Sequence, residues 1–419
     1  MAIDNKDKKV LKSSIEREQN EVACSAECEK IKGSKNLNVP HLRFPEFTEE
    51  WVNVSLKDVA DFQKERISSG LLDESTYIST ENILQNFQGV QSAISIPANT
   101  NVVAYKKNDI LLSNIRPYLK KAWFSDRIGG CSADVFVLRS KTCEPEFLYN
   151  VIASDKFINY VMSGAKGVKM PRGDKNQMES FSFSIPAVVE QRKISRLFQL
   201  LDERIVTQNK IIEDLKKLKS AIIEKYYSQA EKQIVCVTDL GEPFNVGNLA
   251  KDDLAETGMP CVIYGELFTT YGEIISQIES HTNKTEGMIL SKKGDLLFPS
   301  STTVDAMSLI APSVINVDGV ILGGDMFGIH ISTNFNAQYL SYYFNHIAKR
   351  QLAKFAKGST IIHLHYTDIE KAKLFLPSLE EQNRMAKCLL ALDAKMNIEN
   401  IYISLLNGQK TYLLRQMFI

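Results

Sequence analysis

The feature that most constrains the fold of this chain is an internal repeat. Three markers of the first half recur 191 residues later in the second: Ile185-Pro186 as Leu376-Pro377, Glu190-Gln191 as Glu381-Gln382, and Leu201-Asp202 as Leu392-Asp393. Earlier blocks align in the same order at a shorter offset, as Lys107–Leu112 does with Lys293–Phe298. The chain is therefore two tandem copies of one unit. Each copy is a globular part of roughly 140–150 residues followed by a long terminal segment.

Both terminal segments carry a heptad pattern. Side chains recur at alternating spacings of four and three residues, the period of a coiled-coil seam. The first seam runs through Leu201, Ile205, Gln208, Ile212, Leu215, Lys219, Ile222 and Tyr226, and the second through Leu392, Met396, Glu399, Ile403, Leu406, Lys410, Leu413 and Met417. Polar residues interrupt both seams at matching positions. We expect two long helices that pair with each other, most simply antiparallel; the alternative is an ordinary amphipathic core helix in each copy.

The globular parts are predicted to be strand-rich with some helix, which makes the fold class α+β. Short apolar runs predict strands at 109–112, 134–138, 181–185, 295–298, 327–331 and, less regularly, 372–376. Apolar residues at three- and four-residue spacing predict helices at 147–162 and 337–356. The domains that follow are a polar flexible lead-in at 1–38, globular domains at 39–187 and 233–378, and long spacer helices at 188–232 and 379–419.

Composition favours a cytoplasmic globular protein. Hydrophobic residues make up 44% and charged residues 24% of the chain, and fifty basic residues balance fifty acidic ones. No apolar run approaches the roughly 18 residues of a membrane span, and the N-terminus lacks the apolar core of a signal peptide. The seven cysteines are scattered without zinc-site spacing. We expect reduced thiols and no membrane partner.

Catalytic motifs are missing from the sequence. It contains neither a phosphate-binding Gly-x-x-x-x-Gly-Lys-Ser/Thr loop nor a Gly-x-Gly-x-x-Gly fingerprint. It also lacks the Asn/Asp-Pro-Pro-Tyr/Phe run of amino-methyltransferases. His363 and His365 have no nearby third metal ligand, so no metal site is predicted. We expect no catalytic residue and no cofactor in this chain.

Two stretches in each copy carry the chemistry of nucleic-acid binding. In the first copy, a basic segment from Tyr105 to Arg127 contains Ser113–Tyr118 just after a predicted strand, and a glycine-rich basic loop ends the globular part. Arginine and asparagine recognise bases, whereas lysines and backbone amides of loops bind phosphates. The candidate DNA-binding residues there are Ser113, Asn114, Arg116, Tyr118, Lys120, Lys121, Lys166, Lys169, Arg172 and Lys175.

The second copy has different chemistry at the corresponding positions. Its candidates are mostly hydroxyl-bearing: Ser300, Ser301, Thr302, Thr303, Lys357, Ser359, Thr360 and His363. Different side chains on one scaffold are what two domains that recognise different DNA sequences require. A plain solvated loop remains the alternative for any one of these residues.

The sequence resembles a known family at several motifs. The segment Val39–Phe47, then Trp51 and Leu56–Val59, is similar to the opening of Type I restriction-modification specificity subunits. The duplicated segments Gly167–Pro186 and Gly358–Pro377, each followed by Glu-Gln and a long helix, also resemble that family. The resemblance covers about 39–419 and is most specific in the duplicated motif.

The resemblance implies a recognition subunit without catalytic activity. Its two globular parts would be target-recognition domains for the two halves of a split, asymmetric double-stranded DNA site, and its paired helices would set the distance between them. It would dock two modification (methyltransferase) subunits that carry S-adenosylmethionine, and motor-nuclease restriction subunits that use ATP and magnesium.

Two other functions fit the residues. The chain could be the DNA-recognition subunit of a Type IIG-like enzyme, or a non-DNA scaffold in which a coiled coil presents two binding domains. The scaffold alternative predicts that charge reversal at Arg116 or Lys169 leaves every activity unchanged.

Overall fold

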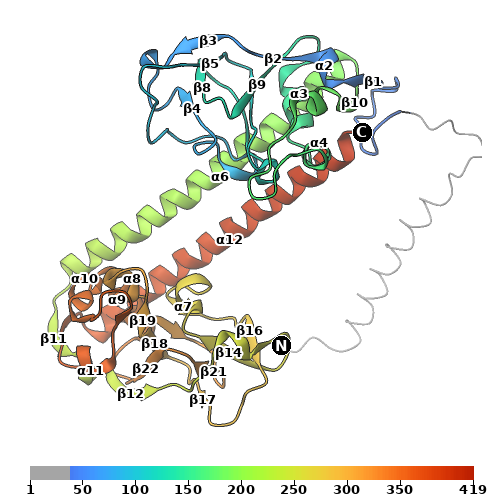
Figure 1. Ribbon diagram of the computed structural model, residues 1–419. Coiled ribbons are helices and arrows are strands. Elements are labelled where there is room, and N and C mark those ends of the chain that lie inside the picture. Colours follow the sequence, from blue (N-terminus) through green and yellow to red (C-terminus); the bar gives the residue numbers. More distant parts are fainter. Residues whose placement is uncertain (1–37) are drawn as a thin grey trace, which may run out of the picture. The chain divides into compact units, whose positions relative to one another are not determined.

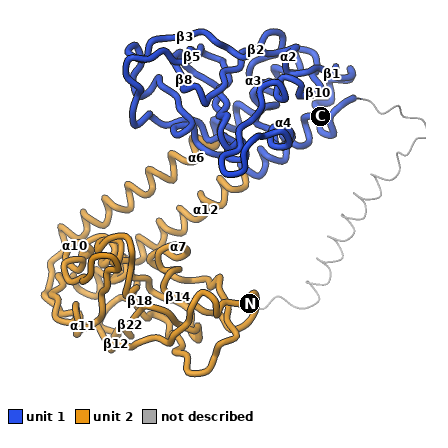
Figure 2. Tube along the Cα trace, in the orientation of Figure 1, with its two compact units in different colours: residues 1–204, 406–419 blue, residues 205–405 orange. Residues whose placement is uncertain are grey.

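The computed structural model describes residues 38–419, so the lead-in predicted for 1–38 lies almost wholly outside the described residues. The chain divides into two compact units (Figure 2). Unit 1 contains the described residues up to Arg204 together with Leu406–Ile419, and unit 2 contains Ile205–Leu405. Both unit boundaries therefore fall inside the long helices. Within residues 38–419, no helix combines the length and the apolar character that crossing a membrane requires.

Unit 1 consists of short strands with helices beside them (Figure 1). Its sheets have the strand orders β2-β9-β6-β7, β3-β5-β8-β4 and β1-β10. The strands are β1 (Val52–Ser55), β2 (Ala60–Phe62), β3 (Arg66–Ser68), β4 (Tyr77–Ile78), β5 (Asn101–Tyr105), β6 (Ile110–Ser113), β7 (Ala122–Phe124), β8 (Gly129–Cys131), β9 (Val135–Ser140) and β10 (Ser182–Ile185). The shorter helices are α2 (Leu56–Val59), α3 (Pro145–Ile152), α4 (Asp155–Ser163) and α5 (Lys175–Glu179).

Unit 2 has a related set of elements. Its sheets have the orders β12-β22-β18-β20-β15, β13-β16-β14-β21-β17, β11-β24 and β19-β23. The strands are β11 (Gln233–Cys236), β12 (Gly241–Asn245), β13 (Leu254–Ala255), β14 (Met259–Ile263), β15 (Ile274–Ile275), β16 (Ser280–Thr282), β17 (Ile289–Leu290), β18 (Asp295–Pro299), β19 (Ser301–Thr302), β20 (Ser313–Ile315), β21 (Ile321–Gly323), β22 (Met326–Ile331), β23 (Ile362–His363) and β24 (Lys373–Leu376). The shorter helices are α7 (Glu266–Thr269), α8 (Ala306–Leu309), α9 (Ala337–His346), α10 (Lys349–Leu352) and α11 (Tyr366–Ile369).

The central strands β6 and β18 are apolar because both of their faces are covered. In β6, Ile110 and Leu112 belong to one hydrophobic cluster and Leu111 to another. In β18, Leu296 lies in one cluster and Leu297 in a second. Successive side chains of a strand point to opposite faces, so an uninterrupted apolar run is the pattern of a strand buried on both sides. The predicted strands at 109–112 and 295–298 are confirmed.

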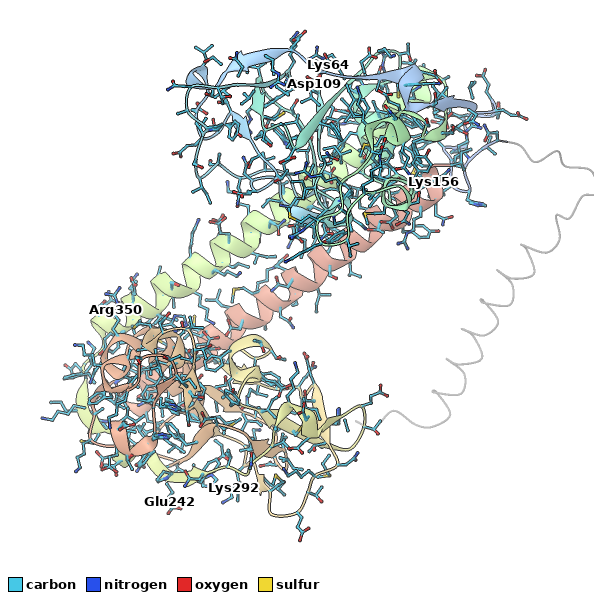
Figure 3. The ribbon with its side chains drawn as sticks, viewed as in Figure 1. Lys64, Asp109, Lys156, Glu242, Lys292 and Arg350 are labelled. Atoms are coloured by element: carbon cyan, nitrogen blue, oxygen red, sulfur yellow. The ribbon has the colours of Figure 1, made fainter. Side chains whose placement is uncertain are left out.

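The turn that precedes each central strand is also repeated. Asn108 has a φ of 69° and Gly294 a φ of 95°, a region that asparagine and glycine tolerate best. The next residue is a buried aspartate, and its carboxylate accepts a hydrogen bond from the backbone N–H three residues earlier, at 2.7 Å for Asp109 and 2.8 Å for Asp295. Figure 3 labels Asp109 in unit 1. The carboxylate thus fixes the turn that starts the strand.

The helices predicted at 147–162 and 337–356 are each broken, so the expectation of single helices is wrong. The first divides into α3 and α4 because Ser154 caps a new helix, and its hydroxyl accepts a hydrogen bond from the N–H of Phe157 at 3.2 Å. The second divides into α9, α10 and the 3-10 turn Ala353–Phe355. There the N–H groups of Ile347 and Ala348 both donate to the carbonyl of Tyr343, which ends α9.

The long helices occur where the sequence predicts them: α6 spans Val188–Gln229 and α12 spans Leu379–Met417. A buried glutamine holds the first turn of each. The amide of Gln191 donates to the carbonyl of Pro186 at 2.8 Å and accepts from the N–H of Glu144 at 2.9 Å. In unit 2, Gln382 makes the same pair of bonds, with Pro377 at 2.9 Å and with the N–H of Asn336 at 3.0 Å.

Those two glutamines explain why a Glu-Gln pair follows each proline. Glu144 and Asn336 occupy the N-caps of α3 and α9. One amide side chain therefore ties the start of a long helix to the start of a globular-domain helix. A buried polar group without a hydrogen-bond partner costs about 1–3 kcal/mol. Each amide avoids this cost for two backbone groups, one carbonyl and one N–H.

All predicted seam positions of α6 and α12 are buried or half-buried. In unit 2 the amide of Gln208 hydrogen-bonds Glu399, and the ammonium group of Lys219 lies 2.8 Å from Asp393 and 3.0 Å from Glu273. From Gln208 to Lys219 along α6, the partner on α12 therefore moves from Glu399 back to Asp393. The two helix segments of this unit therefore run antiparallel.

In unit 1 the remaining interruption is paired in the same way. The ammonium group of Lys410 lies 2.5 Å from a carboxylate oxygen of Asp202. Asp202 and Lys410 lie 191 residues from Asp393 and Lys219 respectively, so the two Lys–Asp pairs are repeats of one contact. The polar interruptions of the seam are therefore all paired.

Candidate nucleic-acid interface

The first candidate loop of unit 1 leaves the end of β6 in a constrained conformation. Ser113 is buried, and its hydroxyl donates to the carbonyl of Ile115 at 3.1 Å. Arg116 adopts φ 50° and ψ 63°, and Lys120 adopts φ 53° and ψ 47°, both left-handed. Such conformations cost a residue other than glycine on the order of 1–2 kcal/mol and persist where the surroundings hold them.

The second candidate loop of unit 1 supplies part of those surroundings. The N–H of Arg116 donates to the carbonyl of Pro171 at 2.8 Å, and the N–H of Gly173 donates to the carbonyl of Asn114 at 3.1 Å. Ile115 and Arg172 form an isolated β-bridge. The two stretches, residues 113–121 and 166–175, therefore lie against each other, and we refer to them as loop pair 1.

Two side chains of loop pair 1 have unsatisfied buried atoms. The Nε of Arg116 and the Oδ1 of Asn114 are inaccessible to solvent and have no hydrogen-bond partner within the part of the chain that the structure describes. Because an unpaired buried polar atom costs about 1–3 kcal/mol, each one in a folded protein needs an explanation. Both atoms belong to residues predicted to contact bases.

Two of the predicted cations hold the loop instead of extending from it. Lys120 pairs with Asp155 at 2.6 Å, and the other oxygen of Asp155 accepts a hydrogen bond from Arg415 at 2.7 Å. The bonds from Lys120 and Arg415 lower the pKa of Asp155, which keeps its carboxylate charged. Lys121 donates to the carbonyl of Thr80 at 2.6 Å. The Lys120 and Lys121 ammonium groups thus have protein partners.

The other predicted residues of loop pair 1 lie nearer solvent. Lys166 pairs with Asp174 at 2.7 Å, Arg172 lies 3.3 Å from Asp134, and Lys175 lies 3.4 Å from Glu179. All three pairs are at least partly exposed, where ion pairs contribute little. The remaining members are exposed: Tyr118 and Lys169.

Unit 2 brings its two candidate stretches together in the same way. Ser301 of β19 pairs with His363 of β23, and Thr302 pairs with Ile362. The N–H of Leu364 also donates to the carbonyl of Ser300 at 2.9 Å. Residues 300–303 and 357–363 therefore form loop pair 2.

Side-chain accessibility divides loop pair 2. Ser300 and Ser301 are buried, Thr302 and His363 are half-buried, and the exposed members are Thr303, Lys357, Ser359 and Thr360. Lys357 pairs with Asp368 at 2.5 Å. The rings of His363 and His365 lie 6.1 Å apart, and residues 38–419 contain no group of three or more side chains placed to hold a metal ion.

The loops also carry exposed apolar residues that the sequence analysis does not include among the DNA-binding candidates. Met170 and Ile361 occupy the tips of the two glycine-containing stretches and are 48% and 50% exposed. The signal was available, because the two residues lie 191 positions apart and are apolar within polar loops.

A second exposed feature lies on α12 within unit 2. Ile398, Ile401 and Leu405 are exposed and are spaced three and four residues apart. That spacing places them on one face of the helix. We call these three residues the α12 stripe; it is a protein-docking candidate rather than part of the loop pairs.

The sequence matches one protein family over most of its length. The model for the Type I restriction modification DNA specificity domain matches twice, at residues 48–217 and 230–406. The two matches correspond to the two copies of the internal repeat.

Individual relatives and solved structures agree with that match. The chain is 24% identical to the Type I restriction enzyme MjaVIII specificity subunit of Methanocaldococcus jannaschii, over 85% of this chain and 89% of the relative. It is 22% identical to the Type I restriction enzyme EcoDI specificity subunit of Escherichia coli, over 48% of this chain and 46% of that protein. The crystal structure of the Type I restriction-modification S subunit from M. genitalium has the same fold, with a TM-score of 0.59 at 14% identity, covering 91% of this chain and 99% of that one. A chain from a structural study of complex assembly and conformational transition in a Type I system gives a TM-score of 0.56 at 17% identity, covering 87% and 96%.

Proposed function

Because the chain belongs to the Type I restriction-modification DNA specificity family, we propose that its two units each recognise one part of a split double-stranded DNA site through loop pairs 1 and 2. As a specificity subunit, it supplies the DNA recognition of a Type I system. The finer assignments below concern which residues contact DNA, what the helices do and which partners bind.

The pairing of the two candidate loops in each unit carries this proposal. The Ile115–Arg172 bridge in unit 1 and the Ser301–His363 pair in unit 2 join the same two segments of the repeat. The scaffold is thus repeated while its side chains differ. One loop pair presents arginine, asparagine and lysine, and the other presents threonine, serine and histidine. Two different base sequences require this combination of a constant support and variable contacts.

Within loop pair 1, we assign base contacts to Arg116 and Asn114. An arginine fork matches guanine O6 and N7, and an asparagine amide matches adenine N6 and N7. Both residues are half-buried and lie on the loop that leaves β6, which supports the assignment because part of each side chain is exposed. We assign phosphate contacts to Lys169 and Arg172, which are exposed cations.

Burial refines the assignments for the serines and two lysines. Ser113, Ser300 and Ser301 are buried, which suits residues that shape the loops. Lys120 and Lys121 are engaged by protein groups and suit the same role. In loop pair 2 the exposed Thr303, Ser359 and Thr360 are then the residues available to DNA.

We propose that α6 and α12 pair as an antiparallel coiled coil that sets the distance between the two half-sites. The burial of the seam and the pairing of its polar interruptions support this. Buried polar residues in a seam cost stability but specify register. Here the Gln208–Glu399, Lys219–Asp393 and Lys410–Asp202 contacts disfavour a shift of one helix along the other.

We also propose that the chain docks two modification subunits and, through the assembly, motor-nuclease restriction subunits in the cytoplasm. The α12 stripe supports a helical docking partner, because isoleucine and leucine at this spacing fit the apolar face of another helix. S-adenosylmethionine would then be bound by the modification subunits, and ATP with Mg²⁺ by the motor subunits. Recognition by this chain would place the target adenine before the methyltransferase.

A genome-wide map of methylated adenine tests the function directly. Strains with the gene intact, deleted and restored in trans are compared. We expect deletion to remove methylation from one split, two-part motif and restoration to return it. An otherwise wild-type copy in which residues 300–303 and 357–363 are exchanged for those of a relative with a different motif should change one part of the motif only.

The matched control is the same exchange for β11, which lies outside both loop pairs. It should leave the motif unchanged. If deletion of the gene leaves every adenine methylation motif in place while the modification subunits are expressed, the chain does not direct methylation and the proposal is wrong.

A further inference from the structure

Each loop pair ends in a small hairpin built in the same way. Lys166 exchanges two backbone hydrogen bonds with Arg172, both at 2.9 Å. Lys357 exchanges two with His363, at 2.9 Å and 2.7 Å. We call residues 166–172 and 357–363 hairpin 1 and hairpin 2. The two are related by the 191-residue repeat and contain the same number of residues.

A glycine near the base gives both hairpins their shape. Gly167 has a φ of 97° and Gly358 a φ of 109°, conformations that other residues rarely adopt. A Cβ on Gly358 would lie 2.1 Å from the carbonyl oxygen of Ile361, and one on Gly167 would lie 3.2 Å from that of Met170. The backbone carbonyl of the residue three positions after the glycine, Met170 or Ile361, therefore lies against the glycine across the turn in both copies.

The tip residue is aliphatic and exposed in both copies. Met170 and Ile361 are 48% and 50% exposed, and Val168, two positions before Met170, is completely exposed. A single exposed aliphatic residue needs no explanation, because most protein surfaces carry some. Here the same position is apolar in both hairpins although their neighbours differ, since Lys169 corresponds to Thr360.

The surroundings of the tips are those of a DNA-binding surface. Exposed cations lie at the base of each hairpin, Lys166 and Arg172 in the first and Lys357 in the second. Their charge favours a polyanion, and the hairpins contact the loops that carry Arg116 and Thr302. Methionine and isoleucine are side chains that enter a groove and pack on a base step or a thymine methyl group.

We propose that Met170 and Ile361 are apolar base contacts, one for each half-site, that the two hairpins insert into a groove of the DNA. This inference rests on the proposed function, and it adds residues of a different chemical kind to the DNA-binding surface. The constant aliphatic tip would anchor each hairpin, while the variable neighbours at 168–169 and 359–360 would distinguish the two half-sites.

The test uses the chain assembled with its modification subunits and duplexes that carry its methylation motif. Affinity is measured by fluorescence anisotropy for wild type, Met170→Ser and Ile361→Ser. The controls are Val52→Ser and Ile234→Ser, which alter exposed aliphatic residues of β1 and β11. We expect each tip variant to bind about tenfold more weakly, in line with the apolar area that a half-exposed side chain would lose, and the controls to bind normally.

Two modified duplex series locate the contact. Thymines are replaced singly by uracil, which removes the methyl group, and adenines by 2-aminopurine, whose fluorescence rises when its stacking is broken. In wild type, we expect uracil at one position to weaken binding, or 2-aminopurine at one step to gain fluorescence, in each half-site. Met170→Ser should abolish that response in one half-site, and Ile361→Ser should abolish it in the other. Which series responds identifies a methyl contact or an unstacked step.

Several results would overturn the inference. Tip variants that bind like wild type, or that respond to both duplex series as wild type does, would show that the tips do not contact bases. Variants that fail to assemble with the modification subunits would place the tips at a protein interface instead. If the wild-type assembly does not prefer its motif over a scrambled duplex, the proposed function itself is rejected. If both tip variants bind the motif with wild-type affinity and still prefer it over a scrambled duplex, only the tip contacts are rejected.

Discussion

The buried glutamine at the start of each long helix gives the sharpest stability prediction. Gln382 is fully buried and bonds the carbonyl of Pro377 and the N–H of Asn336. Gln382→Leu nearly preserves the side-chain volume, so it removes two hydrogen bonds without a large cavity. It leaves the buried carbonyl of Pro377 and the N–H of half-buried Asn336 without partners. At about 1–3 kcal/mol for the buried carbonyl and about 1 kcal/mol for the half-buried N–H, unit 2 should lose about 2–4 kcal/mol of its free energy of unfolding.

Hydrogen exchange followed by mass spectrometry measures this loss where it occurs. Amides of α9 and of the first turns of α12 should exchange about 30- to 1000-fold faster, which is the same free energy expressed as an opening equilibrium. Urea unfolding followed by circular dichroism gives the overall value. Glu381→Gln is the matched control, because Glu381 pairs with Arg384 on the helix surface and should cost less than about 0.5 kcal/mol.

The repeat supplies an independent replicate of this experiment. Gln191→Leu should destabilise α3 and the start of α6 in unit 1 by a similar amount, since Gln191 bonds Pro186 and Glu144. A loss below about 0.5 kcal/mol in both variants, or faster exchange spread evenly over the chain, would refute the argument that these amides tie the helix starts to the globular parts.

Four further outcomes follow from the structure. Arg116→Ala should weaken binding by about 1–3 kcal/mol and relax one position of the methylated motif, whereas an unchanged motif in methylome sequencing would reject the assignment. Deleting one heptad from each of α6 and α12 should alter or abolish the preferred gap of the motif, and an untouched gap would reject the spacer role. Burial raises the pKa of Glu273, but the hydrogen bond from His346 and the charge of Lys219 outweigh it and lower this pKa from 4.5 to about 2. The stabilisation is therefore complete above pH 4.5 and is lost as the pH falls towards 2, by about 3 kcal/mol in urea titrations, and Glu273→Gln should flatten that loss. Ile401→Asp in the α12 stripe should reduce co-purification of the modification subunits without changing thermal stability, and unchanged co-purification would place their docking site elsewhere.

Helices and strands whose buried side chains recur at a regular spacing were predictable from the sequence. The seam of α6 and α12 was located residue by residue, because the side chains that a helix buries recur at a fixed spacing. The strands β6 and β18 followed from short apolar runs after a turn with an Asn or Gly. The repeat also indicated that both copies would place the same two loops for binding.

Features that depend on contacts distant in sequence were not predictable. The break between α3 and α4 depends on one capping bond from Ser154, while the apolar spacing continues across it. The pairing of Lys120 with Asp155 joins residues 35 positions apart, and a charge count along the chain includes that lysine as free. Sheet order and burial of Ser300 or Ser301 likewise depend on which strands become neighbours. The assignment of a DNA role to individual residues remains a prediction.

The composition of unit 1 has a consequence for how the protein is made. Its core includes Leu413, Met417 and Phe418, which pack with residues such as Phe147 and Phe198 from the first half. The carbonyl of Ile419 also accepts a hydrogen bond from the N–H of Ser184 on β10. Unit 2, by contrast, is one continuous stretch, Ile205–Leu405.

During translation, the unit that is started first is therefore completed last. At about 5–20 residues per second, the intervening 200 or so residues take about 10–40 s to synthesise. Throughout that time the apolar surface around Phe147 and Phe198 lacks the helix segment that covers it. On the ribosome, unit 2 has its whole sequence before unit 1 does, and the core of the nascent first half stays incomplete until Leu406–Ile419 is made.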